Sequence, residues 1–175
     1  MTTRAHDAAD QPRVRIDGSA VGGPCCSGSV SVFTRPPDVV TREPVTVMLA
    51  SCPDELAEIQ RLWAWFEELV GLPGRKMYGA ALVDARSYRT CTPIRPDDDP
   101  GTLGLEVGEL PGGTFRRGRL RGEPPGVYAS IGPGVQELES LGLVDRTRPV
   151  VEFYKRRDEV EVWVPVTSRI SPRDR

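Results

Sequence analysis

The stretch Arg146–Val166, RTRPVVEFYKRRDEVEVWVPV, decides how the rest of the chain is interpreted. Two runs rich in valine and aromatic residues flank the charged segment Lys155–Asp158, a composition typical of two antiparallel strands joined by a turn. We therefore predict a buried β-hairpin. Its expected register places Glu152 directly opposite Glu161.

Side chains alternate between the two faces of a strand, so one face of this hairpin is plain hydrophobic core and the other is mixed. The mixed face is either a solvated side of the sheet or a ligand cleft with aromatic walls, in which Glu152 holds a cation or moves a proton. Two facing carboxylates disfavour double ionisation and raise one pKa, which suits a general acid or a proton-sharing ligand site. The residues expected on the mixed face are Glu152, Tyr154, Glu161 and Trp163.

The segment Arg148–Tyr154 (RPVVEFY), followed by a strand ending in Trp163–Val166 (WVPV), resembles the closing hairpin of the GyrI-like small-molecule-binding family. That family includes the effector-binding domains of MerR-type and AraC-type regulators. The upstream segment Leu110–Gly122, in which a Pro-Gly turn precedes an alternating strand, is similar to the family's central strand. Together the matching pieces cover roughly Asp38 to Thr167, and the resemblance implies a small-molecule-binding domain.

Length and charge narrow the classes of protein. A chain of 175 residues can bury a sizeable core as one domain, and its net charge of −2 gives no basic field that would attract nucleic acid or an anionic membrane. The sequence shows neither an apolar run of about 20 residues nor the pattern of a signal peptide. We therefore expect a cytoplasmic protein with no membrane partner and no direct nucleic-acid binding.

Cysteine and histidine usage argues against metal and cofactor chemistry. Cys25 and Cys26 are adjacent, Cys52 and Cys91 stand alone, and His6 is the only histidine. This spacing does not fit a zinc site, so no metal and no cofactor are expected. Without a histidine in the folded part, Ser-His-Asp and Cys-His catalysis are excluded, and carboxylates and tyrosines remain as proton carriers. Cys91 is expected to be a small core residue.

Composition divides the chain into three segments. Residues 1–37 are polar and rich in Gly, Ser and Pro, which predicts a disordered N-terminal tail without the helix-turn-helix of a complete regulator. Residues 38–167 are the predicted GyrI-like effector-binding domain, which would stand alone. Residues 168–175 are a C-terminal tail.

The order strand, helix, hairpin occurs twice between these tails, and Arg89–Ile94 echoes Glu161–Val166. We predict an α+β fold in which duplicated strand-helix-strand-strand modules form one curved antiparallel sheet, with two helices on one face and a ligand cleft on the other. The first helix is expected to begin at Pro53 and to stop at Gly71. The second helical stretch is expected to be interrupted at Gly132-Pro-Gly134, with either a kink or a short turn followed by a second helix.

Helical periodicity places Trp63 at the centre of the apolar stripe of the first helix, where we expect a core residue, and Trp65 at its margin, where a half-exposed ring could form a cleft wall. The predicted cleft has Glu152 at its floor. Its walls are predicted to be Trp65, Tyr78, Tyr154 and Trp163.

Three functions fit this sequence. The first is a stand-alone bacterial domain that binds aromatic or cationic drug-like small molecules, in drug resistance or in sensing. The second, implied by some stand-alone relatives of the family, is a hydrolase that opens the strained cyclopropane of natural products, with Glu152 as the general base. The third is a protein-interaction module of the gyrase-inhibitor type. The first is favoured, so the expected partner is a hydrophobic or cationic small molecule.

Overall fold

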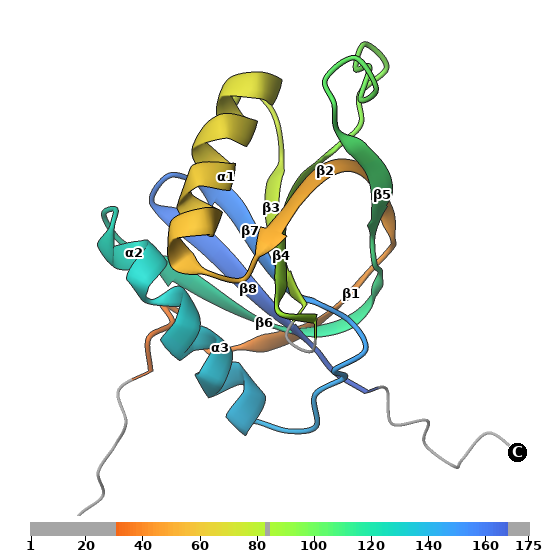
Figure 1. Ribbon diagram of the computed structural model, residues 1–175. Helices are drawn as coiled ribbons and strands as arrows, with labels where there is room; N and C mark the ends of the chain where they lie inside the picture. Colours follow the sequence, from red (N-terminus) through yellow and green to blue (C-terminus); the bar gives the residue numbers. More distant parts are fainter. Residues whose placement is uncertain (1–30, 83–84, 168–175) are drawn as a thin grey trace, which may run out of the picture. The chain divides into compact units, whose positions relative to one another are not determined.

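The computed structural model of the chain describes residues 31–82 and 85–167. This part of the chain has an α+β fold, in which antiparallel strands form one curved sheet and helices cover one of its faces (Figure 1). The predicted fold class is confirmed. The strands are β1 (Asp38–Arg42), β2 (Val45–Pro53), β3 (Met77–Leu82), β4 (Ser87–Pro93), β5 (Glu106–Leu110), β6 (Gly113–Arg121), β7 (Val150–Arg156) and β8 (Glu159–Pro165). The helices are α1 (Leu56–Val70), α2 (Gly126–Ala129) and α3 (Ile131–Ser140).

The strand order, β1-β6-β8-β7-β3-β4-β2-β5, shows the predicted duplication directly. One module is β2-α1-β3-β4 and the other is β6-α2-α3-β7-β8. The duplication makes β1 the counterpart of β5, β2 of β6, β3 of β7 and β4 of β8. Replacing each strand by its counterpart gives the same strand order, read from the opposite edge of the sheet. The sequence echo falls on β4 and β8, where Cys91 and Trp163 occupy matching positions of one buried cluster.

The sheet is curved so strongly that its two edge strands, β1 and β5, meet. The segment β1–β2 pairs with the segment β5–β6 as one continuous antiparallel ladder. Arg42 faces Gly113 in the β1–β6 pair, and Val45 faces Leu110 in the β2–β5 pair, so the register continues without a shift across both two-residue connections. These connections touch. A Cβ added at Gly112 would lie only 2.6 Å from the carbonyl oxygen of Arg42, so this crossing needs a glycine.

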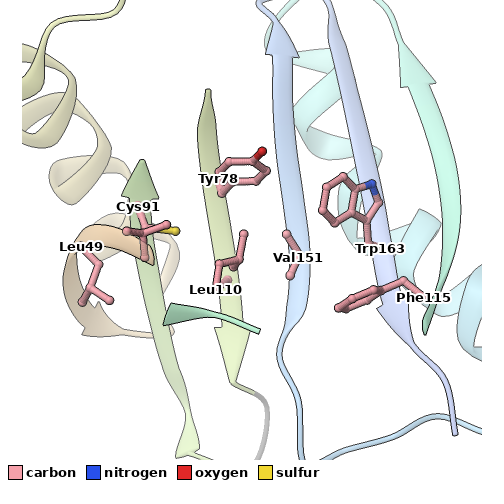
Figure 2. Packing of buried hydrophobic residues seen from close by; sticks show 9 residues of the cluster. Leu49, Tyr78, Cys91, Leu110, Phe115, Val151 and Trp163 are labelled. Carbon is pink, nitrogen blue, oxygen red and sulfur yellow. The ribbon is translucent and has the colours of Figure 1, made fainter. Parts of the chain in front are cut away.

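Each face of the sheet has its own core. The face that we call the inner face carries one apolar cluster, shown in Figure 2: Val47, Leu49, Tyr78, Ala80, Cys91, Leu110, Phe115, Val151 and Trp163. The opposite face, which we call the helix face, carries two clusters. Met48, Phe66, Val70, Met77 and Leu105 pack under α1. The second helix-face cluster, under α2 and α3, is Phe33, Leu120, Val127, Leu138, Val150, Val160, Val162 and Val164.

The predicted hairpin is present as β7 and β8, but its predicted register is wrong. Glu152 faces Val162 and Glu161 faces Phe153, because the turn lies at residues 157–158 and a bulge between Tyr154 and Arg156 then shifts the pairing by one residue. The two carboxylates therefore point to opposite faces of the sheet. Glu152 lies on the helix face and Glu161 on the inner face.

Two helix boundaries also differ from the sequence expectation. Pro53 ends β2, and α1 begins three residues later at Leu56. The second helical stretch breaks at Ser130, so Pro133 lies within the first turn of α3, where its missing N–H removes no helical hydrogen bond. Within the described residues, no helix is both long and apolar enough to cross a membrane.

The folded unit starts before residue 38. Phe33 is only 9% exposed, and its ring lies over Gly118, where an added Cβ would come within 2.1 Å of it. The Ser31 hydroxyl, 2.6 Å away, and the Val32 N–H both donate to Glu137 of α3. The segment 31–37 therefore packs on the domain and is not part of a tail. Of the predicted tails 1–37 and 168–175, residues 1–30 and 168–175 lie outside the described residues.

Candidate functional site

The space between the helices on the helix face is filled by aromatic side chains. α1 packs over β2 and β4, and α2 and α3 pack over β6 and β8, so the central strands β3 and β7 lie between the two groups of helices. Tyr154 of β7 packs against both helix-face clusters. Its ring contacts Trp63 of α1 at a centroid distance of 4.7 Å and Tyr128 of α2 at 6.0 Å. We call Trp63, Tyr88, Tyr128 and Tyr154 the aromatic seam.

Glu152 lies beneath the aromatic seam and is 9% exposed. Its Oε2 accepts hydrogen bonds from the hydroxyls of Tyr88 and Tyr154, each 2.7 Å long. The indole N–H of Trp63 donates in turn to the hydroxyl oxygen of Tyr88 at 3.0 Å. Among the described residues no hydrogen bond is made to the other carboxylate oxygen, Oε1, whose lone pairs can still accept one.

Gly79 provides the room for this cluster. It lies directly opposite Glu152 on the neighbouring strand β3. A Cβ at this position would lie 2.0 Å from the Tyr88 hydroxyl oxygen and 2.7 Å from Oε2 of Glu152. Any side chain here would therefore displace the tyrosine from the carboxylate.

Burial raises the pKa of Glu152, and the nearby Asp54 raises it further, while the hydrogen bonds from Tyr88 and Tyr154 act in the opposite direction. No basic side chain of the described residues lies within 4.0 Å of this carboxylate. Burial and the charge of Glu152 also raise the pKa values of both phenols, which keeps them protonated as hydrogen-bond donors. The result is a buried, acidic, aromatic site without a cation.

Tyr78 and Trp163 lie on the inner face, away from Glu152. Tyr78 stacks on Phe153 with a centroid distance of 4.8 Å and an interplanar angle of 20°, and its ring centroid is 6.0 Å from that of Trp163. The indole N–H of Trp163 donates to Glu161 at 3.1 Å. These residues fill the inner core (Figure 2).

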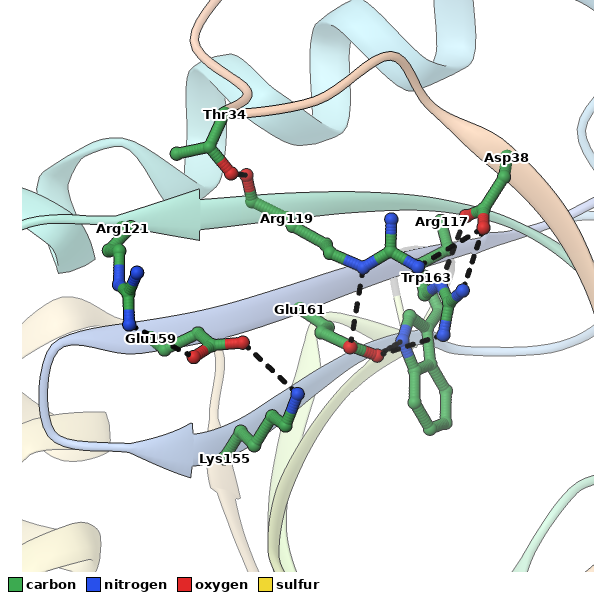
Figure 3. Close-up of polar contacts among 9 residues, drawn as sticks. All are labelled: Thr34, Asp38, Arg117, Arg119, Arg121, Lys155, Glu159, Glu161 and Trp163. Atoms are coloured by element: carbon green, nitrogen blue, oxygen red, sulfur yellow. Dashed lines mark hydrogen bonds and ion pairs between the residues drawn. The ribbon is translucent and has the colours of Figure 1, made fainter.

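Glu161 is compensated by arginines, unlike Glu152. Arg117 and Arg119 of β6 lie 3.5 Å and 3.7 Å from its carboxylate oxygens, and both also reach Asp38 of β1 (Figure 3). The hydrogen bond from Arg117 is the main reason that the pKa of Asp38 falls to about 2. The ion pairs between these acids and arginines connect β1, β6 and β8, which gives Glu161 a structural role.

A shallow depression of about 310 Å³ lies near the rim of the inner face and reaches Val45 and Tyr78. Its charged lining residues are Arg75, Lys76 and Arg95. The charge of Arg75 is balanced by a buried ion pair with Asp98. Lys76 and Arg95 remain, so the depression as a whole is basic. A cation would not be attracted there, and the acidic site lies on the helix face instead.

The structure thus divides the predicted site residues into three groups. Glu152 and Tyr154 are brought together, Tyr78 and Trp163 lie on the opposite face, and Trp65 is 45% exposed on the surface of α1. Sequence reasoning missed Tyr88 as a site residue. Alternation from the core residue Cys91 places Tyr88 on the other face of β4, but only the pairing of β3 with β7 brings it to Glu152.

Trp63 was expected to be plain core, and it is a half-buried hydrogen-bond donor at the edge of the site. An indole N–H that is removed from water needs an acceptor, and this requirement could have indicated from the sequence that Trp63 donates a hydrogen bond.

Comparison with protein-family models and with curated proteins gives no match. Solved structures do match. An integron cassette protein from the mobile metagenome of Vibrio cholerae aligns with a TM-score of 0.62 and 18% identity, covering 75% of this chain and 95% of that one. SAV2435, solved bound to tetraphenylphosphonium, aligns with a TM-score of 0.53 and 13% identity, covering 77% and 95% of the two chains. At these identities the matches establish a shared fold, and that fold agrees with the one implied by the GyrI-like resemblance.

Proposed function

We propose that this protein is a member of the GyrI-like family that binds aromatic organic cations at Glu152. The observation that supports this proposal best is the carboxylate itself, which is buried, held by two phenols and not paired with any cation of the described residues. An isolated buried charge is costly, and a bound cation offsets that cost. SAV2435, which shares the fold, was solved with a lipophilic aromatic cation.

The walls of the site suit the same ligand class. Trp63, Tyr88 and Tyr154 surround Glu152 with aromatic rings, which attract cations through their π-systems and bury apolar surface. Because Glu152 is almost fully covered, a ligand must take the place of part of the aromatic seam. In this proposal the protein captures or senses toxic cationic compounds in the bacterial cytoplasm, without contacting nucleic acid.

The test is a calorimetric titration with tetraphenylphosphonium. We expect the unmodified protein to bind it and Glu152→Gln to weaken binding by about 1.5–3 kcal/mol, because the substitution keeps the shape of the side chain and removes its charge. Triphenylphosphine oxide, which is aromatic but neutral, should bind both proteins equally well. Glu159→Gln, on the same hairpin, is the matched control and should bind tetraphenylphosphonium like the unmodified protein. Failure of the unmodified protein to bind the cation, or equal binding by Glu152→Gln, contradicts the proposal.

Hydrolysis of a strained ring is the second candidate, favoured by the free Oε1 of Glu152, which could accept a proton from water. The raised pKa values of Tyr88 and Tyr154 make these phenols poor proton donors to a substrate, so binding is better supported. If turnover occurs, Glu152→Gln should reduce it by about 10²–10⁴-fold with little change in the affinity for a neutral substrate.

A further inference from the structure

A second acid lies beside the aromatic seam. Glu67 follows Trp63 by four residues on α1, so the two side chains project from the same side of the helix. Glu67 is half-buried, and burial raises its pKa. No basic side chain of the described residues lies within 4.0 Å of it, whereas Glu58 on the same helix pairs with Arg61. The charge of Glu67 is therefore not compensated by any basic side chain in the part of the chain that the structure describes.

Tyr128 marks the outer end of the aromatic seam. It is 39% exposed, its ring lies 6.0 Å from that of Tyr154, and its hydroxyl is fixed by donating to the carbonyl oxygen of Arg157 at 3.1 Å. Burial raises the pKa of Tyr128, the charge of Arg157 lowers it, and the charge of Glu67 raises it again, which agrees with the position of Glu67 on the Trp63 side of α1. Glu67 and Tyr128 therefore lie at the surface end of a path of aromatic rings, and Glu152 lies at the buried end.

We propose that Glu67 and Glu152 together select aromatic dications, with one positive charge of the ligand at each acid. This inference rests on the proposed function, because it assigns the inner charge to Glu152. The Cα atoms of Trp63 and Glu67 are one helical turn, about 6 Å, apart, and Trp63 donates to the Tyr88 hydroxyl that itself donates to Glu152, so the two acids lie on either side of the same rings. The rings of Trp63, Tyr154 and Tyr128 would line the space between them. A monocation compensates only Glu152 and leaves Glu67 unpaired.

Ethidium and propidium form a matched pair for the test, because they share one aromatic ring system and propidium carries a second, quaternary ammonium charge on a short arm. Fluorescence titration of the full-length protein gives the ratio of the two dissociation constants. We expect propidium to bind the unmodified protein about 2–5-fold more tightly than ethidium, as for a partly exposed ion pair. Glu67→Gln should bring this ratio close to one, and Glu67→Lys should reverse it. Glu68→Gln, an exposed neighbour on α1, should leave the ratio unchanged.

The outcomes separate this inference from the proposed function. If tetraphenylphosphonium does not bind the unmodified protein, the proposed function fails and the inference fails with it. If tetraphenylphosphonium binds but propidium shows no advantage over ethidium, or keeps its advantage in Glu67→Gln, only the inference is overturned. Thermal unfolding of each variant confirms that it is folded, and Glu67→Lys gives a second, independent reading of the sign of the effect.

Discussion

At the scale of single residues, the contrast between Glu152 and Glu161 is the most informative feature of the protein. Both are buried acids on neighbouring strands, yet Glu161 is matched by two arginines and Glu152 only by neutral phenols. A buried acid without a counter-ion lowers folding stability, which is why the proposed function assigns the bound cation to Glu152 and not to Glu161. The pH dependence of binding and of stability should therefore report on Glu152.

The affinity for tetraphenylphosphonium should decrease on acidification. Burial raises the pKa of Glu152 from the ordinary value of 4.5, and a permanent cation binds the ionised form, so affinity should be lost as the pH falls through this raised pKa. The stability effect has the opposite sign. Because the folded protein holds the proton more tightly than the unfolded chain, this group becomes more destabilising as the pH rises, and Glu152→Gln should gain stability relative to the unmodified protein with rising pH. Titrations at several pH values check the first statement and thermal unfolding checks the second. An affinity for tetraphenylphosphonium that does not change with pH in the unmodified protein would contradict the first statement.

Gly79→Ala tests the packing around the acid. The added methyl group collides with the Tyr88 hydroxyl and with Glu152, so we expect a loss of about 1–3 kcal/mol in the free energy of unfolding and a loss of cation binding. Gly126→Ala is the control, because a Cβ at that helix position meets no atom within 4 Å. Denaturant unfolding measures both variants. Equal stability of the two would show that Tyr88 can move aside without cost.

At the scale of elements, the hairpin shows how far sequence reasoning extends. Composition and alternation correctly predict β7 and β8, and the duplicated order of elements is correct because the two hydrophobic periods differ clearly. The site was harder to predict, since one bulged residue near the turn moves Glu152 to the other face of the sheet. A bulge is set by tertiary packing and leaves no signal in the alternation of the strand, so the sequence alone could not place Glu152 and Glu161 on opposite faces.

The helix α1 carries two tryptophans whose roles should separate. Trp63→Ala should cost about 3 kcal/mol of stability and weaken cation binding, because it removes a half-buried ring, the edge contact with Tyr154 and the hydrogen bond to Tyr88. Trp65→Ala should cost less than about 1 kcal/mol and leave binding unchanged, since this ring is 45% exposed. Chemical denaturation and ligand titration of both variants give the two numbers. A larger loss of affinity at Trp65 would restore the sequence expectation that Trp65 forms a wall of the cleft.

At the scale of the whole described unit, the duplication explains where the acid lies. Gly79 and Glu152 face each other on the two central strands, and they occupy matching positions of the two modules. The two modules meet at this point, and the helices of each module cover its outer strands. A duplicated sheet with one helix group per module therefore leaves its central strands to be covered by side chains, and one module supplies the glycine while the other supplies the carboxylate.

The boundary of the unit gives the last prediction. A chain shortened to begin at Ser31 should keep its unfolding midpoint, whereas one that begins at Asp38 loses Phe33, which fills the space over Gly118 and Gly134, and the hydrogen bonds to Glu137. Loss of this ring should cost about 3 kcal/mol, which lowers the midpoint by about 6–12 °C for a protein of this size. Phe33→Ala in the full-length chain should reproduce most of the decrease, because the ring rather than the backbone provides the packing. If the chain beginning at Asp38 melts at the unchanged temperature, the segment 31–37 contributes nothing to the fold and the domain starts at β1, as its sequence alone suggests.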